Sequence, residues 1–201
     1  MPLEEDSSAL RGAEVSERLV AGNDWSDRDA VGLRLTECRL DNVALDETEL
    51  RRSGIRDVLV AGGSWANLDA GEAFLKRVEF SNTRLTGVSF ANATLEDIVF
   101  SDCRLDLSSF RFAKLASVRF DRCLLAESDF YEAAVKAVVF SSCSLVGASL
   151  AGVTFDDTEL RGCDLSAIGN AERLRGVRMP WADIVQSADV LAAGLGIEIA
   201  E

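Results

Sequence analysis

The chain contains no histidine, and this absence removes the most common general base and metal ligand of proteins. Its five cysteines form no CxxC pair, and the sequence has neither a glycine-rich phosphate loop nor a long insertion that would build a deep pocket. Because these residues and motifs are missing, we predict that the protein is not an enzyme, has no catalytic residue and uses no metal or other cofactor.

Apolar runs long enough to cross a bilayer are also missing, and the acidic first ten residues lack the apolar region of a signal peptide. Cysteines without a secretion signal indicate a reduced, cytoplasmic chain. The formal net charge is −13, from 34 acidic and 21 basic residues. Such a chain repels nucleic acid and anionic membranes and is attracted to basic surfaces. We therefore expect a protein partner, no direct nucleic-acid binding and no membrane contact.

A period of five residues dominates what is present. Every fifth residue from Leu10 to Leu165 is apolar. At 48% apolar content this unbroken run would arise by chance roughly once in ten billion sequences. Two positions earlier the residue is mostly small or β-branched from Cys38 onward, and residues two apart in extended chain point to the same side. Each unit thus directs one large and one small side chain inward, and its remaining residues favour turns.

A period of 20 residues is superimposed on the shorter one. If 20 residues make one coil, four sides of five residues close a square, and equivalent positions stack vertically with opposite sides carrying the same large residue. We interpret the cysteines as core residues, with a metal or redox role as the alternative. The predicted core stack consists of Phe80, Phe90, Phe100, Phe110, Phe120, Phe130, Phe140, Cys103, Cys123, Cys143 and Cys163.

Several local triplets follow the motif A-(D/N)-L-x-x, with Phe in place of Leu in some units. On these triplets residues 10–165 resemble the pentapeptide-repeat family. The resemblance implies an all-β fold, a right-handed quadrilateral β-helix. About eight coils at roughly 4.8 Å each would give a rod about 38 Å long. The triplets include Ala93-Thr94-Leu95, Ser128-Asp129-Phe130 and Cys163-Asp164-Leu165.

We divide the chain into three segments. Residues 1–30 are expected to form an N-terminal cap and an irregular first coil, because Arg18, Asn23 and Arg28 occupy small inward positions. Residues 31–168 are the repeat helix, in which Gly63 and Leu68 fit the pattern poorly. Residues 169–201 are expected to form a partial coil, a short α-helix and a short strand, because the register breaks near Asn170 and the spacing then becomes helical.

The apolar residues of the C-terminal segment have two interpretations. They cap the open end of the core, or the cap is also the seam of a homodimer. The segment from Gln186 resembles the C-terminal helix and strand of the loopless mycobacterial quinolone-resistance members of the family, which implies a tail-to-tail dimer. The cap or dimer residues are Ile184, Ala188, Leu191, Leu195, Ile197 and Ile199.

Folding the sequence onto a 20-residue coil gathers carboxylates on one side, as an acidic docking face. The resemblance implies a non-enzymatic acidic rod, similar to duplex DNA, that binds DNA gyrase or topoisomerase IV and modulates it or protects it from quinolones or toxins. Two alternatives are a scaffolding solenoid with an unrelated protein partner and charge that serves solubility alone. The face consists of Asp46, Glu47, Glu49, Asp69, Glu72, Asp106, Glu127, Asp129 and Glu132.

Overall fold

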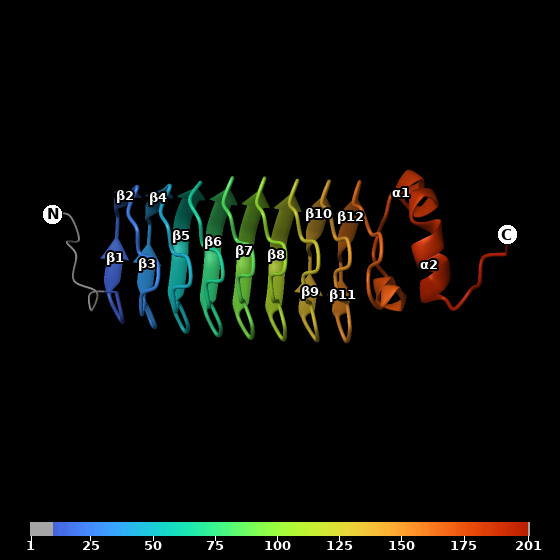
Figure 1. Cartoon of the computed structure of the whole chain (residues 1–201), viewed down its shortest axis with the longest axis horizontal. Coiled ribbons are helices and arrows are strands. Elements are labelled where there is room, and N and C mark those ends of the chain that lie inside the picture. Colours follow the sequence, from blue (N-terminus) through green and yellow to red (C-terminus); the bar gives the residue numbers. More distant parts are fainter. Residues whose placement is uncertain (1–9, 201) are drawn as a thin grey trace.

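A parallel β-solenoid, closed by helices at its C-terminal end, is formed by residues 10–200, the part of the chain that the computed structural model describes (Figure 1). Successive coils are offset by 20 residues: Val15 lies opposite Leu35, and Phe80 lies opposite Phe100. The longest path through the sheet joins eight strands in this register. The solenoid and its 20-residue coil, both predicted from the sequence, are confirmed.

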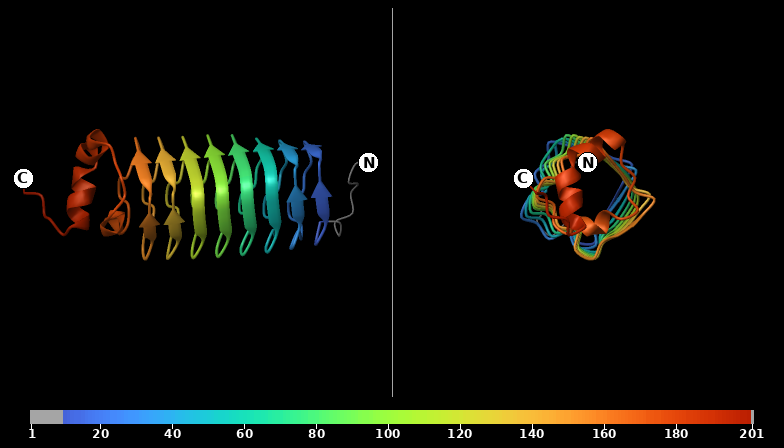
Figure 2. Two further views of the ribbon diagram at one scale, coloured as in Figure 1. Left: turned by 180° about the vertical axis from the view of Figure 1, so that it is seen from behind. Right: turned by 90° about the vertical axis from the view of Figure 1, so that its right-hand side faces the viewer.

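Each coil has four sides, and the view along the rod shows the stacked coils in outline (Figure 2). The first side carries residues 13–15 and their equivalents every 20 residues, the second carries 18–20, the third 23–25 and the fourth 28–30. The third and fourth sides stack through single parallel bridges, such as Asp29 to Glu49. The first two sides carry the strands β1 (Glu14–Ser16), β2 (Leu19–Ala21), β3 (Arg34–Thr36), β4 (Arg39–Asp41), β5 (Gly54–Ala61), β6 (Phe74–Ser81), β7 (Thr94–Ser101), β8 (Lys114–Asp121), β9 (Ala134–Lys136), β10 (Val139–Ser141), β11 (Thr154–Asp156) and β12 (Glu159–Arg161).

The corners between sides depend on one backbone conformation. The second corner residue takes a positive φ, for example 52° at Asn42 and 51° at Asn82. Asn, Asp and Gly tolerate this left-handed conformation best, which explains why the turn positions of the sequence are rich in them. The conformation turns the chain sharply after every three-residue side and so closes the square.

The interior is filled by aromatic and aliphatic ladders. Phe100 stacks on Phe120 with ring centroids 5.0 Å apart and planes 6° apart. On the opposite side Phe110 stacks on Phe130 at 4.8 Å, and Phe110 meets Phe120 edge to face at 6.1 Å. All residues of the predicted core stack are buried, the four cysteines among them. Each coil therefore buries its large side chains only because the next coil covers them.

Two of the residues that fit the repeat poorly are compensated by their neighbours. Gly63, on the small inward position, adjoins Trp65, the largest inward side chain, which is 1% exposed. Leu68 adjoins Ala70, so the large and small positions have exchanged sizes, and both residues are buried. On each of these two sides the large residue offsets the small one, so the summed side-chain volume changes little. Protein cores tolerate such an exchange better than a net change in volume.

The N-terminal coil is more regular than its sequence suggests. We expected an irregular coil over residues 1–30, but residues 10–30 contain β1 and β2, paired in the same parallel register as the later strands. Arg18 is exposed and Arg28 half-buried, because this coil is covered on one side only. Part of the expected cap, residues 1–9, lies outside the described residues. The three-segment division of the chain stays a prediction.

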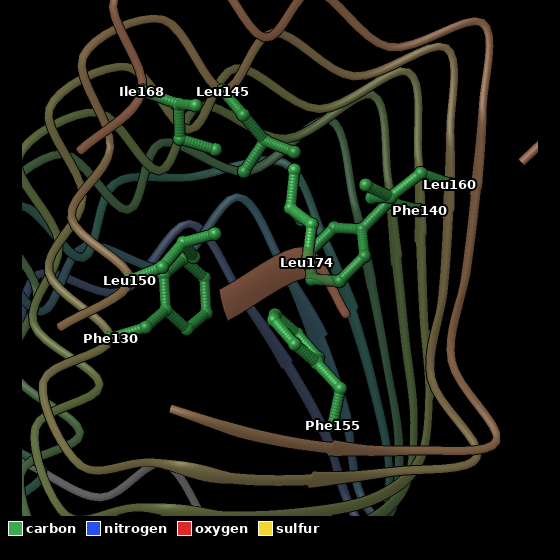
Figure 3. Close-up of a pocket in the computed structure, with 8 residues that line it drawn as sticks. All are labelled: Phe130, Phe140, Leu145, Leu150, Phe155, Leu160, Ile168 and Leu174. Atoms are coloured by element: carbon green, nitrogen blue, oxygen red, sulfur yellow. The ribbon is translucent and has the colours of Figure 1, made fainter. Parts of the chain in front are cut away.

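The C-terminal end is closed by a partial coil and three short helices, η1 (Ala171–Leu174), α1 (Trp181–Gln186) and α2 (Ala188–Gly194). The amide of Leu160 donates to the carbonyl of Arg178 at 3.0 Å, so the partial coil still extends the ladder. Leu174 reaches over the last phenylalanines and leaves a cavity of only about 10 Å³ (Figure 3). The expected short C-terminal α-helix is confirmed, in two pieces that meet at Ser187, whereas the expected strand is wrong, because residues 197–200 form none.

Candidate functional site: an acidic strip on the fourth side

Carboxylates gather on the outward positions of the fourth side and of the corner that precedes it. We call this set the acidic strip, and its described outward positions hold no Lys or Arg. Parallel bridges stack Asp29 on Glu49 and Glu49 on Asp69, while Asp129 stacks between Ser109 and Ser149. The strip therefore runs along most of the rod. Its members are Asp27, Asp29, Asp46, Glu47, Glu49, Asp69, Asp106, Glu127 and Asp129.

The acidic strip differs from the predicted docking face at both margins. Glu72 and Glu132 lie on the following corner, which also carries four arginines and which we call the basic edge. Asp27 and Asp29 belong to the strip but were missed, because the first coil was expected to be irregular. The 20-residue period was the signal that would have found them. The basic edge contains Arg11, Arg51, Arg52 and Arg111.

Arginines neutralise part of the strip. Asp129 pairs with Arg111 at 2.6 Å, and Asp69 lies 3.8 Å from Arg51. Asp29 pairs with Arg11, and Asp106 pairs with Arg104 of the third side at 3.4 Å. In the described part of the chain, no ion pair involves the other five carboxylates: Asp27, Asp46, Glu47, Glu49 and Glu127. The charge available to a partner is thus smaller than the number of carboxylates suggests.

On the basic edge itself, Arg51 donates to Glu72 at 2.7 Å, and Arg52 lies 3.4 Å from the same carboxylate. The hydrogen bond from Arg51 lowers the pKa of Glu72 below its usual value. Glu72 therefore neutralises the basic edge and adds little to the acidic strip. This corner separates the strip from the mixed charges of the first side.

Several strip carboxylates are fixed in place by the backbone. In Asp69 and Asp129 one oxygen accepts a hydrogen bond from the amide two residues later, at 2.9 and 2.8 Å. Asp46 accepts hydrogen bonds from Ser64 and from the amide of Ala66 in the next coil, at 2.5 and 2.6 Å. The backbone hydrogen bond from Val31 is the main cause that lowers the pKa of Asp29. These four carboxylates of the strip are therefore held in fixed positions along the rod.

The cysteines lie in the core, away from this surface. All five described thiols are unpaired and buried. The pKa values of Cys123 and Cys143 are raised to about 12, mainly by hydrogen bonding to the preceding thiol of the stack, and that of Cys163 is raised by Cys143. Among the described residues no group of His, Cys, Asp and Glu side chains is arranged to hold a metal ion.

We predict that these thiols are unreactive in the folded protein. In native buffer at pH 8 a chromogenic disulfide reagent should label the five cysteines only over hours, because burial blocks access to all of them and the raised pKa values of Cys123, Cys143 and Cys163 suppress their thiolates. In guanidinium chloride all five should react within minutes. Rapid reaction at all sites in native buffer would contradict the buried stack.

The predicted cap and dimer residues divide into two groups. Leu191 packs against the core, and Ile184 is half-buried. Ala188 is exposed, and so are Leu195, Ile197 and Ile199. Trp181, at the start of α1, is 77% exposed and was not predicted. A groove of about 490 Å³, lined in part by Arg175 and Leu195, opens between η1 and α2. This end of the rod therefore exposes considerable apolar surface.

No described helix is long and apolar enough to cross a membrane. Two family models match parts of the chain. A family model described as a pentapeptide repeat region matches residues 73–150, and one described as pentapeptide repeats (8 copies) matches residues 136–167. No curated protein sequence matches the chain.

Solved structures of repeat proteins are similar to this chain. One is trypsin-treated QnrB1, a plasmid-mediated fluoroquinolone resistance protein, with 18% identity, coverage of 94% of this chain and 100% of that chain, and a TM-score of 0.49. Another is HetL, a pentapeptide repeat protein involved in heterocyst differentiation regulation from the cyanobacterium Nostoc sp. strain PCC 7120. It has 19% identity, covers 86% of this chain and 90% of that chain, and has a TM-score of 0.35.

Proposed function

The chain belongs to the pentapeptide-repeat family, and we propose that it is a non-enzymatic protein-interaction module that docks a basic partner on its acidic strip. One observation carries this proposal: three neighbouring outward columns hold nine carboxylates and no cation among the described residues. A rigid line of charge steers an oppositely charged partner and fixes its register. The buried, unpaired thiols agree with a reducing, cytoplasmic setting.

We further propose that the partner is a bacterial type II topoisomerase, whose DNA-binding groove an acidic rod would enter in place of DNA. Duplex DNA carries one charge per about 1.7 Å of its axis, whereas the strip spreads nine carboxylates over five coil steps, about 24 Å, roughly one per 3 Å. The imitation is therefore partial and depends on shape as well as charge. A supercoiling assay with purified gyrase tests this step. Absence of both inhibition and quinolone protection at micromolar protein would contradict the proposal that the partner is a topoisomerase.

A triple variant tests whether the partner docks on the acidic strip. In Glu47→Gln/Glu49→Gln/Glu127→Gln, three carboxylates without an ion pair lose their charge. We expect the inhibition constant for gyrase to rise about tenfold and its salt dependence to weaken, because each carboxylate adds to the steering field.

The control for the strip removes the same charge elsewhere. Glu17→Gln/Glu37→Gln/Glu79→Gln neutralises three carboxylates on the second side and the corner before it. This variant should inhibit gyrase within twofold of the unmodified protein. Equal losses in the two triple variants would show that net charge, and not the strip, governs binding.

We also propose that the C-terminal end joins two copies of the chain. Leu195, Ile197 and Ile199 are 72%, 55% and 68% exposed, and Trp181 lies on the same end. Exposed apolar surface of this extent is typical of an interface. In sedimentation analysis the full chain should behave as a dimer and Leu195→Glu/Ile197→Glu as a folded monomer, while Leu19→Glu, exposed on the second side, should stay dimeric. A monomeric full chain would refute the seam.

A further inference from the structure

Two large apolar side chains project from the middle of the acidic strip's side. Leu107 lies on the corner before the fourth side and Phe112 on the corner after it, in the same coil, and they are 58% and 43% exposed. The amide of Leu107 donates to Ala126 at 2.9 Å and that of Phe112 to Tyr131 at 2.8 Å. Both residues are thus held by the coil ladder, with the outward Ser109 between them.

The backbone at these two residues is unsuited to their side chains. Leu107 and Phe112 have φ values of 59° and 57°. Elsewhere in the described chain, the non-glycine residues with positive φ are polar or charged, or alanine. Equivalent corners of the preceding coils use Gly87 and Asn92, which accept this conformation without strain. Neither folding nor solubility explains a bulky apolar residue here, and strain of this kind concentrates at functional positions.

Phe112 stands on a preorganised support. Its ring meets Tyr131 edge to face, with centroids 5.4 Å apart and planes 85° apart. The guanidinium of Arg111 lies 4.5 Å from the centre of the Tyr131 ring and donates to Asp129 at 2.6 Å. A side chain already fixed in this way loses little conformational freedom when a partner covers it. Aromatic residues and arginine also dominate the energetic centres of protein interfaces.

The surroundings of the two residues define what would bind. The centre of the fourth side is uncharged at Ser89 and Ser109, whereas Asp69 precedes these serines and Asp129 follows them in the stack. Glu127 occupies the corner of the coil after Leu107. An apolar centre between charged ends is the arrangement of a protein interface, with a dry core and a polar rim. Its complement is an apolar recess flanked by lysines and arginines.

We propose that Leu107 and Phe112 are the anchors of this docking surface, and that they insert into an apolar recess bordered by basic residues on a partner protein. This inference rests on the proposed function as an interaction module and names the part of the strip that carries the binding energy. The carboxylates steer the partner and set its register, and the two apolar side chains slow its release.

A double variant separates binding from folding. Leu107→Asn/Phe112→Asn places a residue suited to positive φ at both corners, so the midpoint of thermal unfolding should stay equal or rise. Binding to purified bacterial gyrase, measured by titration calorimetry, should weaken at least about tenfold. The control Leu19→Thr/Leu59→Thr, on the second side across the coil, should bind within twofold of the unmodified protein. Unchanged binding by the double variant would overturn the proposal.

A second measurement decides the proposal if gyrase does not bind the unmodified protein. That result would refute the topoisomerase partner alone. Benzoylphenylalanine placed at position 107 or 59 is then photolysed in a lysate of the source cells. We expect an adduct at 107 and none at 59, and the captured protein, once purified, should bind Leu107→Asn/Phe112→Asn at least tenfold more weakly. No adduct at 107, or equal adducts at both positions, would overturn the docking surface.

Discussion

Replacing Phe120 with alanine is expected to lower the free energy of unfolding by about 3–5 kcal/mol. Phe120 is fully buried and stacks between Phe100 at 5.0 Å and Phe140 at 4.8 Å. It also meets Phe110 of the opposite ladder edge to face, with ring centroids 6.1 Å apart, so the truncated site would lose aromatic contacts on three sides. The ladder register is fixed by the coils above and below, and they cannot collapse into the cavity.

Urea unfolding followed by circular dichroism measures this change, and Phe112→Ala is the matched control. Phe112 is the same residue type with its ring largely outside the core, so its truncation should change stability by no more than about 0.5 kcal/mol. Because each coil contacts only its neighbours, the Phe120→Ala protein should also unfold less cooperatively, with a lower dependence on urea. Similar losses for the two variants would contradict the aromatic ladder as the source of stability.

The regular part of the rod could be predicted because the same packing arrangement repeats in every coil. One interval of five residues fixes which side chains point inward, and one interval of 20 fixes which of them touch, so Phe100 could be placed above Phe80 without coordinates. Where a residue departs from the pattern, the outcome depends on its neighbours. Taken alone, Gly63 is too small for its position and Leu68 too large for its position. Each fits the core only because its neighbour, Trp65 or Ala70, has the opposite size.

Single-position reasoning also failed at the first coil. Arg18 and Arg28, on small inward positions, led to the prediction of an irregular coil. The backbone register does not require an apolar side chain at every inward position when one face of the coil is open, and β1 and β2 form in the usual register.

The positions of the carboxylates in the acidic strip could be predicted from the sequence, but their ion pairs could not. The 20-residue period places Glu49 and Asp69 in one column, as found. It does not say that Arg51 would reach across to both Asp69 and Glu72, because long side chains choose partners by local geometry. The exposed apolar pair Leu107 and Phe112 was overlooked for a different reason. A search for charge passes over apolar residues, and their significance appears only with the backbone conformation that they occupy.

Gly63→Ala should destabilise the protein by about 2–5 kcal/mol, which combines the cost of a positive φ with that of a steric clash. Gly63 has a φ of +81°, and a methyl group there would lie 2.2 Å from the carbonyl oxygen of Val43 in the coil below. That oxygen belongs to the backbone of the stack, so relief requires the coils to separate locally. The neighbouring Trp65, 1% exposed, would lose its packing, and its fluorescence should shift to longer wavelength.

Gly22→Ala isolates the conformational part of this cost. Gly22 has a φ of +65°, but a methyl group there would meet no atom within 4 Å. Its substitution should therefore cost only about 1–2 kcal/mol, because the left-handed conformation alone is penalised. The difference between the two glycine variants, measured by urea unfolding under the same conditions, reports the tightness of coil stacking at Val43. If both variants lost the same stability, the rod would be flexible enough to admit a methyl group between coils, and the rigid spacing on which the acidic strip depends would be wrong.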